Sequence, residues 1–165
     1  MPSAAHSICK PEPASEAINV NVTLLFAEST YEEVAEAFLA GLEDRRARGL
    51  GVGNIASVAS FFISRIDTAV DGLLIAKIQA TTDGGERRRL AKLLGRAAIA
   101  NARITYQRAR AIYSSTRMHQ LAAHGAQLQR LLWASTSPKS PDYRDVIYVE
   151  ELIGSGTVRR GSGSP

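Results

Sequence analysis

The first well-patterned stretch of the chain, INVNVTLLF at residues 18–26, alternates polar and apolar side chains as a β-strand does. A strand would separate these residues onto two faces: Asn19, Asn21 and Thr23 against Val20, Val22 and Leu24. Asparagine is a poor strand former, so its repetition on one face needs an explanation. That face is either the solvated side of an edge strand or the lining of an enclosed polar site, as at the centre of a barrel.

The segment after this strand has the period of an amphipathic helix. Ser29 or Thr30 is expected to cap its N-terminus, followed by acidic residues in the first turn, where the helix dipole favours negative charge. Apolar residues then recur at helical spacing: Val34, Phe38, Leu39 and Leu42. Basic residues followed by glycine, in RRARGLGVG, are expected to end the helix.

The strand-then-helix pattern repeats along the chain. Residues 57–63 form a second apolar strand, and the long helical region that follows is broken near TTDGG and stops at Gly125. LQRLLWAST contains a third strand, and residues 146–149 are expected to form a fourth. Strands that alternate with helices indicate parallel strands joined by right-handed crossovers, so the predicted fold class is α/β.

Parallel α/β folds carry their chemistry where strands end and loops begin. The polar residues at those positions are therefore the candidates for a site: Asn21, Thr23, Ser60, Arg65, Ser135, Thr136 and Lys139. Several of them also have a purely structural interpretation. Ser60 could be a small residue that packs tightly, Arg65 an ion-pair partner of Asp67, and Lys139 a solvated loop charge.

Length and composition fit one globular domain. The chain has 165 residues, of which 45% are hydrophobic, enough for a sizeable core. No apolar run approaches the roughly 18 residues of a membrane span, and the first residues lack the pattern of a secretory signal. A single cysteine, Cys9, cannot form an internal disulfide. We therefore expect a cytoplasmic protein.

The formal net charge is +4, and most of the 20 basic residues are arginine. An arginine cluster in the long helical region supports an alternative hypothesis, a basic helical module that binds nucleic acid. Its members are Arg87, Arg88, Arg89, Arg96, Arg103, Arg108 and Arg110. We favour the simpler interpretation, in which these arginines form a solvated face opposite a core-facing apolar stripe.

Five motifs occur in order along the chain: INVNVTLLF, SVASFFISRID, GRAAIANARITYQ, LLWASTSPK and DVIYVEELIG. Together they resemble the second half of bacterial transaldolase over residues 18–157. The resemblance implies a partial (β/α)8 TIM barrel of about four parallel strands with long crossover helices. With the Gly- and Ser-rich end, it divides the chain into an irregular N-terminal segment (1–17), a partial barrel domain (18–157) and a disordered tail (158–165).

Transaldolases act in the pentose phosphate pathway, and the resemblance implies the same for this chain. The family moves a dihydroxyacetone unit from sedoheptulose 7-phosphate to glyceraldehyde 3-phosphate through a lysine Schiff base. It uses no metal and no organic cofactor. His119 and His124 of this chain lack the spacing and the acidic partner of a metal site. The resemblance thus implies a transferase that acts on sugar phosphates, with no nucleic-acid or membrane partner.

By motif, two residues of the first strand match catalytic positions of the family. Asn21 corresponds to the asparagine that hydrogen-bonds substrate hydroxyls, and Thr23 to the threonine that holds the catalytic water. The polar face of the first strand would then line the interior of the barrel.

Four further residues match the sugar-phosphate end of the family's pocket. Ser60 corresponds to a serine at that end, and Phe62 to the aromatic residue that walls it. Arg65 corresponds to a phosphate-binding arginine, a role suited to a permanently charged planar fork. Lys139, after WASTSP, falls where the family places a second basic phosphate ligand.

The resemblance fails before the first strand. The family's Schiff-base lysine lies on the preceding strand, and Lys10 in CKPEPAS stands too close to Asn21 for the helix that should intervene. The acidic residues of the earlier strands are also unmatched. We therefore expect the chain on its own to be inactive. A third hypothesis is a non-catalytic remnant that needs a partner chain.

Overall fold

The computed structural model describes residues 18–141, 143–144, 146–155 and 157–159. Its elements in chain order are β1 (Val20–Leu25), α3 (Glu28–Ala47), β2 (Ser57–Phe62), α4 (Ser64–Ala80), α5 (Gly84–Ala91), α6 (Ala97–Tyr113), α7 (Thr116–Ala122), β3 (Arg130–Ala134), α8 (Ile147–Leu152) and β4 (Thr157–Arg159). In this part of the chain no helix has both the length and the apolar character needed to cross a membrane.

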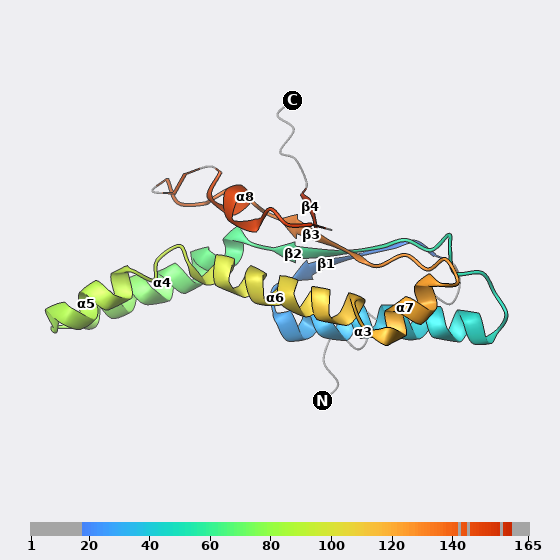
Figure 1. Cartoon of the computed structure of the whole chain (residues 1–165). Coiled ribbons are helices and arrows are strands. Elements are labelled where there is room, and N and C mark those ends of the chain that lie inside the picture. Colours follow the sequence, from blue (N-terminus) through green and yellow to red (C-terminus); the bar gives the residue numbers. More distant parts are fainter. Residues whose placement is uncertain (1–17, 142, 145, 156, 160–165) are drawn as a thin grey trace, which may run out of the picture.

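The four strands form one parallel sheet in the order β1-β2-β3-β4. Helices fill each connection: α3 between β1 and β2, α4 to α7 between β2 and β3, and α8 between β3 and β4. Figure 1 shows α3, α6 and α7 lying along the sheet, whereas α5 projects beyond it. The predicted α/β class, with parallel strands and crossover helices, is confirmed.

The side of the sheet that faces the helices forms the core. Ala59 and Phe61 of β2 are fully buried there, in register with Leu131 and Trp133 of β3. The Phe61 and Trp133 rings pack edge to face with centroids 6.1 Å apart. Because side chains alternate along a strand, Ser60 faces the opposite side, which carries the candidate site.

The alternation predicted for the first strand fails at Leu24. This residue has a φ of 63°, and the pairing of β1 with β2 shifts register between Val22 and Leu25. The strand is therefore bulged, and one extra residue changes which side chain turns inward. Leu25 is 3% exposed and joins the core, whereas Leu24 is 57% exposed, so the prediction that Leu24 shares a face with Val20 and Val22 is wrong.

The cap predicted for the first helix is also wrong. Helix α3 already begins at Glu28, its N-cap is Ala27, and no side chain caps it. Ser29 and Thr30 therefore lie inside the first turn. Tyr31 is fully buried in the core. Its packing favours a helix that begins before the cap residues indicated by the local sequence.

The fourth strand is not where the sequence placed it. Residues 147–149 begin helix α8, and β4 is the later segment Thr157–Arg159. Tyr148 and Leu152, four residues apart, are both buried on one face of α8, so tertiary packing overrides the β-propensity of VIYV. Strand β4 includes Val158 and Arg159, the first two residues of the expected tail; residues 160–165 lie outside the described residues.

Candidate functional site

The two asparagines of the first strand have different environments. The Asn19 side-chain oxygen accepts a hydrogen bond of 2.8 Å from the backbone N–H of Ala56, just before β2. The Asn21 side-chain oxygen accepts one of 2.8 Å from the Ser60 hydroxyl, within the sheet. Asn19 therefore pins the chain as it enters β2, whereas Asn21 presents its amide on the face opposite the core. The polar face of β1 is therefore not simply the solvated side of an edge strand, and its two asparagines do not have the same role.

Asn21 and Ser60, predicted to belong to one site, are directly bonded across the β1–β2 pair. Ser60 is only 4% exposed, whereas Asn21 is exposed. The hydrogen bond from the buried serine therefore restricts the orientation of the exposed Asn21 amide. Thr23 follows Asn21 by two positions and precedes the bulged residue Leu24, which keeps it on the Asn21 face. Its side chain is exposed. The structure thus places these three residues on the same face of the β1–β2 pair.

Phe62 and Arg65 lie where β2 passes into α4. The guanidinium carbon of Arg65 stands 5.3 Å from the centroid of the Phe62 ring, a cation–π contact. Phe26 packs on the same phenylalanine, with ring centroids 5.5 Å apart. The ring is therefore held from one side by another aromatic ring, and Arg65 keeps an exposed charge.

Asp67 does not act as the surface partner of Arg65. It is 1% exposed, and its two carboxylate oxygens accept hydrogen bonds from the Ala98 N–H at 2.8 Å and the Tyr148 hydroxyl at 2.7 Å. The alternative in which Arg65 is an ordinary ion-pair partner of Asp67 is therefore not what the structure shows.

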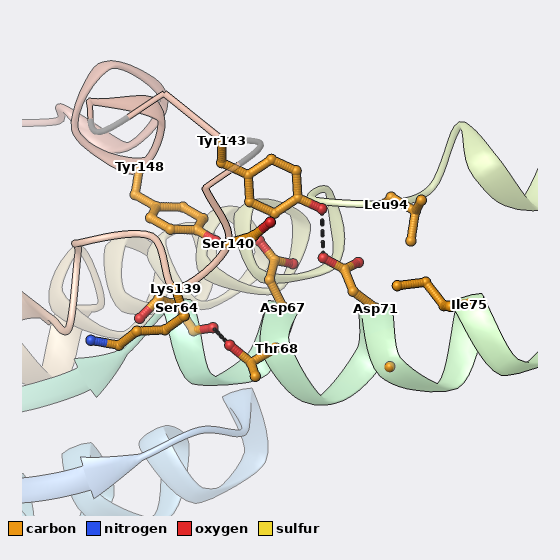
Figure 2. A pocket seen from close by; sticks show the side chains of 11 residues that line it. Ser64, Asp67, Thr68, Asp71, Ile75, Leu94, Lys139, Ser140, Tyr143 and Tyr148 are labelled. Atoms are coloured by element: carbon orange, nitrogen blue, oxygen red, sulfur yellow. Dashed lines mark hydrogen bonds between the residues drawn. The ribbon is translucent and has the colours of Figure 1, made fainter.

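Lys139 lies in the segment that joins β3 to α8 and is exposed. It lines a cavity of about 360 Å³ together with residues of α4 and of its own segment. Figure 2 shows its ammonium group on the Ser64 side, pointing away from the carboxylate of Asp71. Lys139 is thus placed beside the start of the helix that also carries Arg65.

The ends of β2 and β3 are tied together at the same place. The Ser64 N–H donates to the Ser135 carbonyl at 3.0 Å, and the two hydroxyls of these serines lie 2.9 Å apart. Ser135 has a φ of 55°, in the left-handed region that a non-glycine residue rarely adopts. Of the polar strand-end residues, Ser135 therefore has a structural contact, and it sets the direction in which the chain leaves β3.

The structure shows a hydrogen-bonded set of polar side chains that the sequence did not predict to interact. They are Asp67 and Asp71 of α4, Tyr143 of the β3–α8 connection and Tyr148 of α8; the two aspartates and Tyr148 are buried, and Tyr143 is half-buried. The pKa of Tyr148 is raised, first by burial and then by its hydrogen bond to Asp67. The available signal was two aspartates four residues apart, which share one face of the helix with Ser64, because carboxylates on a buried face require partners.

Three of the seven arginines in the cluster, Arg89, Arg103 and Arg108, form ion pairs with glutamates of the described part of the chain. Arg108 contacts Glu28 and Glu32 of α3, and Arg103 contacts Glu151. Outside the cluster, Arg117 makes a two-pronged contact with Glu43 and also reaches Glu36. This pairing fits the interpretation of a solvated, charge-balanced helical surface.

The chain matches the family model of transaldolase/fructose-6-phosphate aldolase over residues 11–159. It is similar to the transaldolase of Trichodesmium erythraeum, 54% identical over 144 residues, which are 87% of this chain and 38% of that protein. Transaldolase 2 of a Nostoc species is 51% identical over 145 residues, 87% of this chain and 38% of the relative. Transaldolase of Saccharopolyspora erythraea is 46% identical over 144 residues, 87% of this chain and 37% of the relative.

The chain thus spans about two fifths of the length of the curated relatives it matches. Its four parallel strands with crossover helices are consistent with a part of a (β/α)8 barrel. Since the family model covers most of the chain, the chain belongs to the transaldolase/fructose-6-phosphate aldolase family.

Proposed function

We propose that this chain forms the sugar-phosphate-binding part of a transaldolase. The reaction moves a dihydroxyacetone unit from sedoheptulose 7-phosphate to glyceraldehyde 3-phosphate, as a cytoplasmic step of the pentose phosphate pathway. A lysine amine attacks the donor ketone and water leaves, and the Schiff base then accepts the electron pair of the carbon–carbon bond that breaks. Residues 18–157 would act as one part of the barrel.

The observation that carries the proposal is the hydrogen bond from Ser60 to Asn21 on the face opposite the core. Two residues assigned to one site by their motifs, 39 positions apart, are in direct contact. In the proposed site, Asn21 binds substrate hydroxyls and Thr23 holds the water that relays protons.

The phosphate would be bound just beyond these residues. Phe62 walls the pocket and supports Arg65, whose planar charged fork suits a phosphate group. Lys139 approaches from the β3–α8 connection as a second cation. The Ser60 hydroxyl is held by its hydrogen bond to Asn21. The amine that forms the Schiff base would come from a strand other than these four, and Lys10 lies outside the described residues.

A chimaera tests the proposal. Residues 18–159 replace the corresponding segment of the Trichodesmium erythraeum transaldolase, which is 54% identical to this chain over 144 residues. We expect the chimaera to catalyse the transfer, and Arg65→Ala to raise KM for the sugar phosphates about 10- to 100-fold, because a charge-assisted contact is lost. Arg87→Ala, on the exposed surface of α5, serves as the control and should leave KM unchanged.

Two results would contradict the proposal. A folded chimaera without transferase activity would show that the inserted residues do not form a working site. An Arg65→Ala chimaera with the same KM as its parent would remove the phosphate-binding role of that residue.

A further inference from the structure

We propose that Asp67 and Asp71 are positioning residues, which dock the β3–α8 connection onto α4 and so place Lys139 at the start of the helix that carries Arg65. The inference rests on the proposed function, because it assigns these aspartates a role in assembling the phosphate site. Neither aspartate would touch the substrate.

The docking surface is one buried face of α4. Ser64, Asp67 and Asp71 are spaced three and four residues apart, so they lie above one another on the helix. Ser64 and Asp67 are 1% exposed and Asp71 is 8% exposed, which is unusual for carboxylates. Buried charges are retained only where hydrogen bonds satisfy them.

The connection and the first turn of α8 meet this face at three points. Ser135 bonds to Ser64 at the end of β3, as described above. The Tyr143 hydroxyl donates to Asp71 at 2.6 Å, and the Tyr148 hydroxyl donates to Asp67 at 2.7 Å. Figure 2 shows both tyrosine rings approaching the aspartates from the side of the connection.

The same carboxylates also hold the chain that leads into α6. Asp71 accepts the Gly95 N–H at 3.0 Å, and Asp67 accepts the Ala98 N–H at 2.8 Å. The start of α6 has no side-chain cap of its own, so Asp67 supplies that acceptor from another helix. Each aspartate therefore joins three separate parts of the chain.

Lys139 lies between the first two docking points, Ser135 and Tyr143. Arg65 directly follows Ser64 on the helix that provides the docking face. The two proposed phosphate ligands come from distant parts of the sequence but share one rigid support. If the connection were not docked on α4, it would have to become ordered when an anion binds. The entropy cost of that ordering would offset the binding free energy that Lys139 contributes.

Limited proteolysis tests the docking itself. Trypsin cleaves after Lys139, so the rate of that cleavage in the full chain reports how often the connection opens. We expect Tyr143→Phe and Asp71→Ala to raise the rate about tenfold. Tyr106→Phe, which removes a hydroxyl bonded to the Ser155 carbonyl at 2.9 Å, is the matched control and should leave it unchanged. Equal rates in all variants would overturn the inference.

A double-mutant cycle tests whether docking acts through Lys139. The probe is inorganic phosphate, titrated by NMR against the full chain. Lys139→Ala should weaken binding about tenfold in the parent and less than twofold in the Tyr143→Phe background, whereas Arg65→Ala should weaken it in both. Asp71→Asn keeps an acceptor oxygen and should restore most of the affinity lost in Asp71→Ala.

The possible results separate the two proposals. If Lys139→Ala weakens phosphate binding equally in both backgrounds, the aspartates do not act through Lys139 and the inference is wrong. If the parent chain shows no Arg65- or Lys139-dependent phosphate binding while the proteolysis result holds, the docking stands and the proposed phosphate site fails.

Discussion

Arg65 stands over the ring of Phe62, 5.3 Å from its centroid, so the first turn of α4 covers the last residue of β2. The contact joins a wall residue of the proposed pocket to a proposed phosphate ligand. An aromatic face attracts a cation and limits the orientations of the guanidinium, which leaves less freedom to lose when an anion binds.

Phe62→Leu keeps an apolar side chain but removes the aromatic face. We expect sugar-phosphate affinity in the chimaera to fall about threefold, because an exposed cation–π contact contributes about 0.5–1 kcal/mol. Phe26→Leu is the control, since Phe26 packs on Phe62, whereas the cation–π contact of Arg65 is with Phe62 itself. The prediction fails if both variants change KM equally.

The Asn21–Ser60 bond predicts a coupled pair. Ser60→Ala should cost about 1 kcal/mol of unfolding free energy, a typical value for a hydrogen bond whose exposed acceptor can return to water. In the Ser60→Ala background, Asn21→Ala should cause no further loss of unfolding free energy, because the hydrogen bond is already absent. Urea unfolding of the two single variants and the double variant measures this, and additive effects would show that the bond does not contribute.

The surroundings of Gly95 predict that a single added methyl group strongly lowers the stability of the chain. Its φ is 69°, and a Cβ there would lie 2.8 Å from Cζ of the Tyr143 ring. We expect Gly95→Ala to destabilise the chain by about 2 kcal/mol or more, from backbone strain plus the steric clash. Gly49→Ala is the matched control, because Gly49 has a φ of 72° with nothing within 4 Å of its Cβ position, so it reports the strain alone.

Thermal or urea unfolding compares the two glycine variants. In a Tyr143→Ala background the cost of Gly95→Ala should fall to that of Gly49→Ala. Equal costs in the parent chain would show that the Tyr143 ring does not pack against Gly95.

The Glu43–Arg117 pair predicts a pH dependence on the acid side. Hydrogen bonds from Arg117 hold the pKa of Glu43 below its ordinary value of 4.5, against a smaller opposing effect of burial. The unfolded chain then binds this proton more readily than the folded one. The pair's stabilisation is therefore present above the ordinary pKa and is lost as pH falls through the lower folded pKa.

In the Glu43→Gln variant, the unfolding free energy should accordingly fall less steeply as the pH drops below 4.5. At neutral pH it should cost about 0.5 kcal/mol, since the pair is half exposed and solvent screens it. Arg117→Gln should produce the same flattening. Urea midpoints measured across acid pH check this, and an unchanged acid limb would contradict it.

The two unpaired edges of the described sheet predict that the chain associates with itself. Within the described residues, β1 pairs with β2 alone and β4 with β3 alone, so each has an edge available to another strand. At tens of micromolar we expect oligomers in light scattering after gel filtration, and fewer of them with the edge charge of Val158→Lys. A monodisperse monomer that melts cooperatively would contradict the prediction, and co-purification of a polypeptide that supplies strands would favour the remnant hypothesis.

Several elements could be predicted because their signal is local. The alternation of β1, the apolar runs of β2 and β3 and the period of α3 depend on neighbours within a few residues. The motifs also placed Asn21, Ser60, Phe62 and Arg65 near strand ends, and the structure shows the contacts between Asn21 and Ser60 and between Phe62 and Arg65. The functional roles of these residues stay predictions.

Other features depended on contacts between distant residues. The bulge at Leu24 is a property of pairing with β2, and α8 forms where VIYV looks like a strand because Tyr148 and Leu152 are buried together. Tyr143 and Tyr148 reach Asp71 and Asp67 across 72 and 81 positions of the chain.

The sequence by itself therefore determined the fold class, the family and the order of the elements from β1 to β3, since periodicity and motif are written in consecutive residues. Only the tertiary structure decided which buried carboxylate meets which hydroxyl. A buried charge must find partners, but its local sequence does not specify which distant segment supplies them.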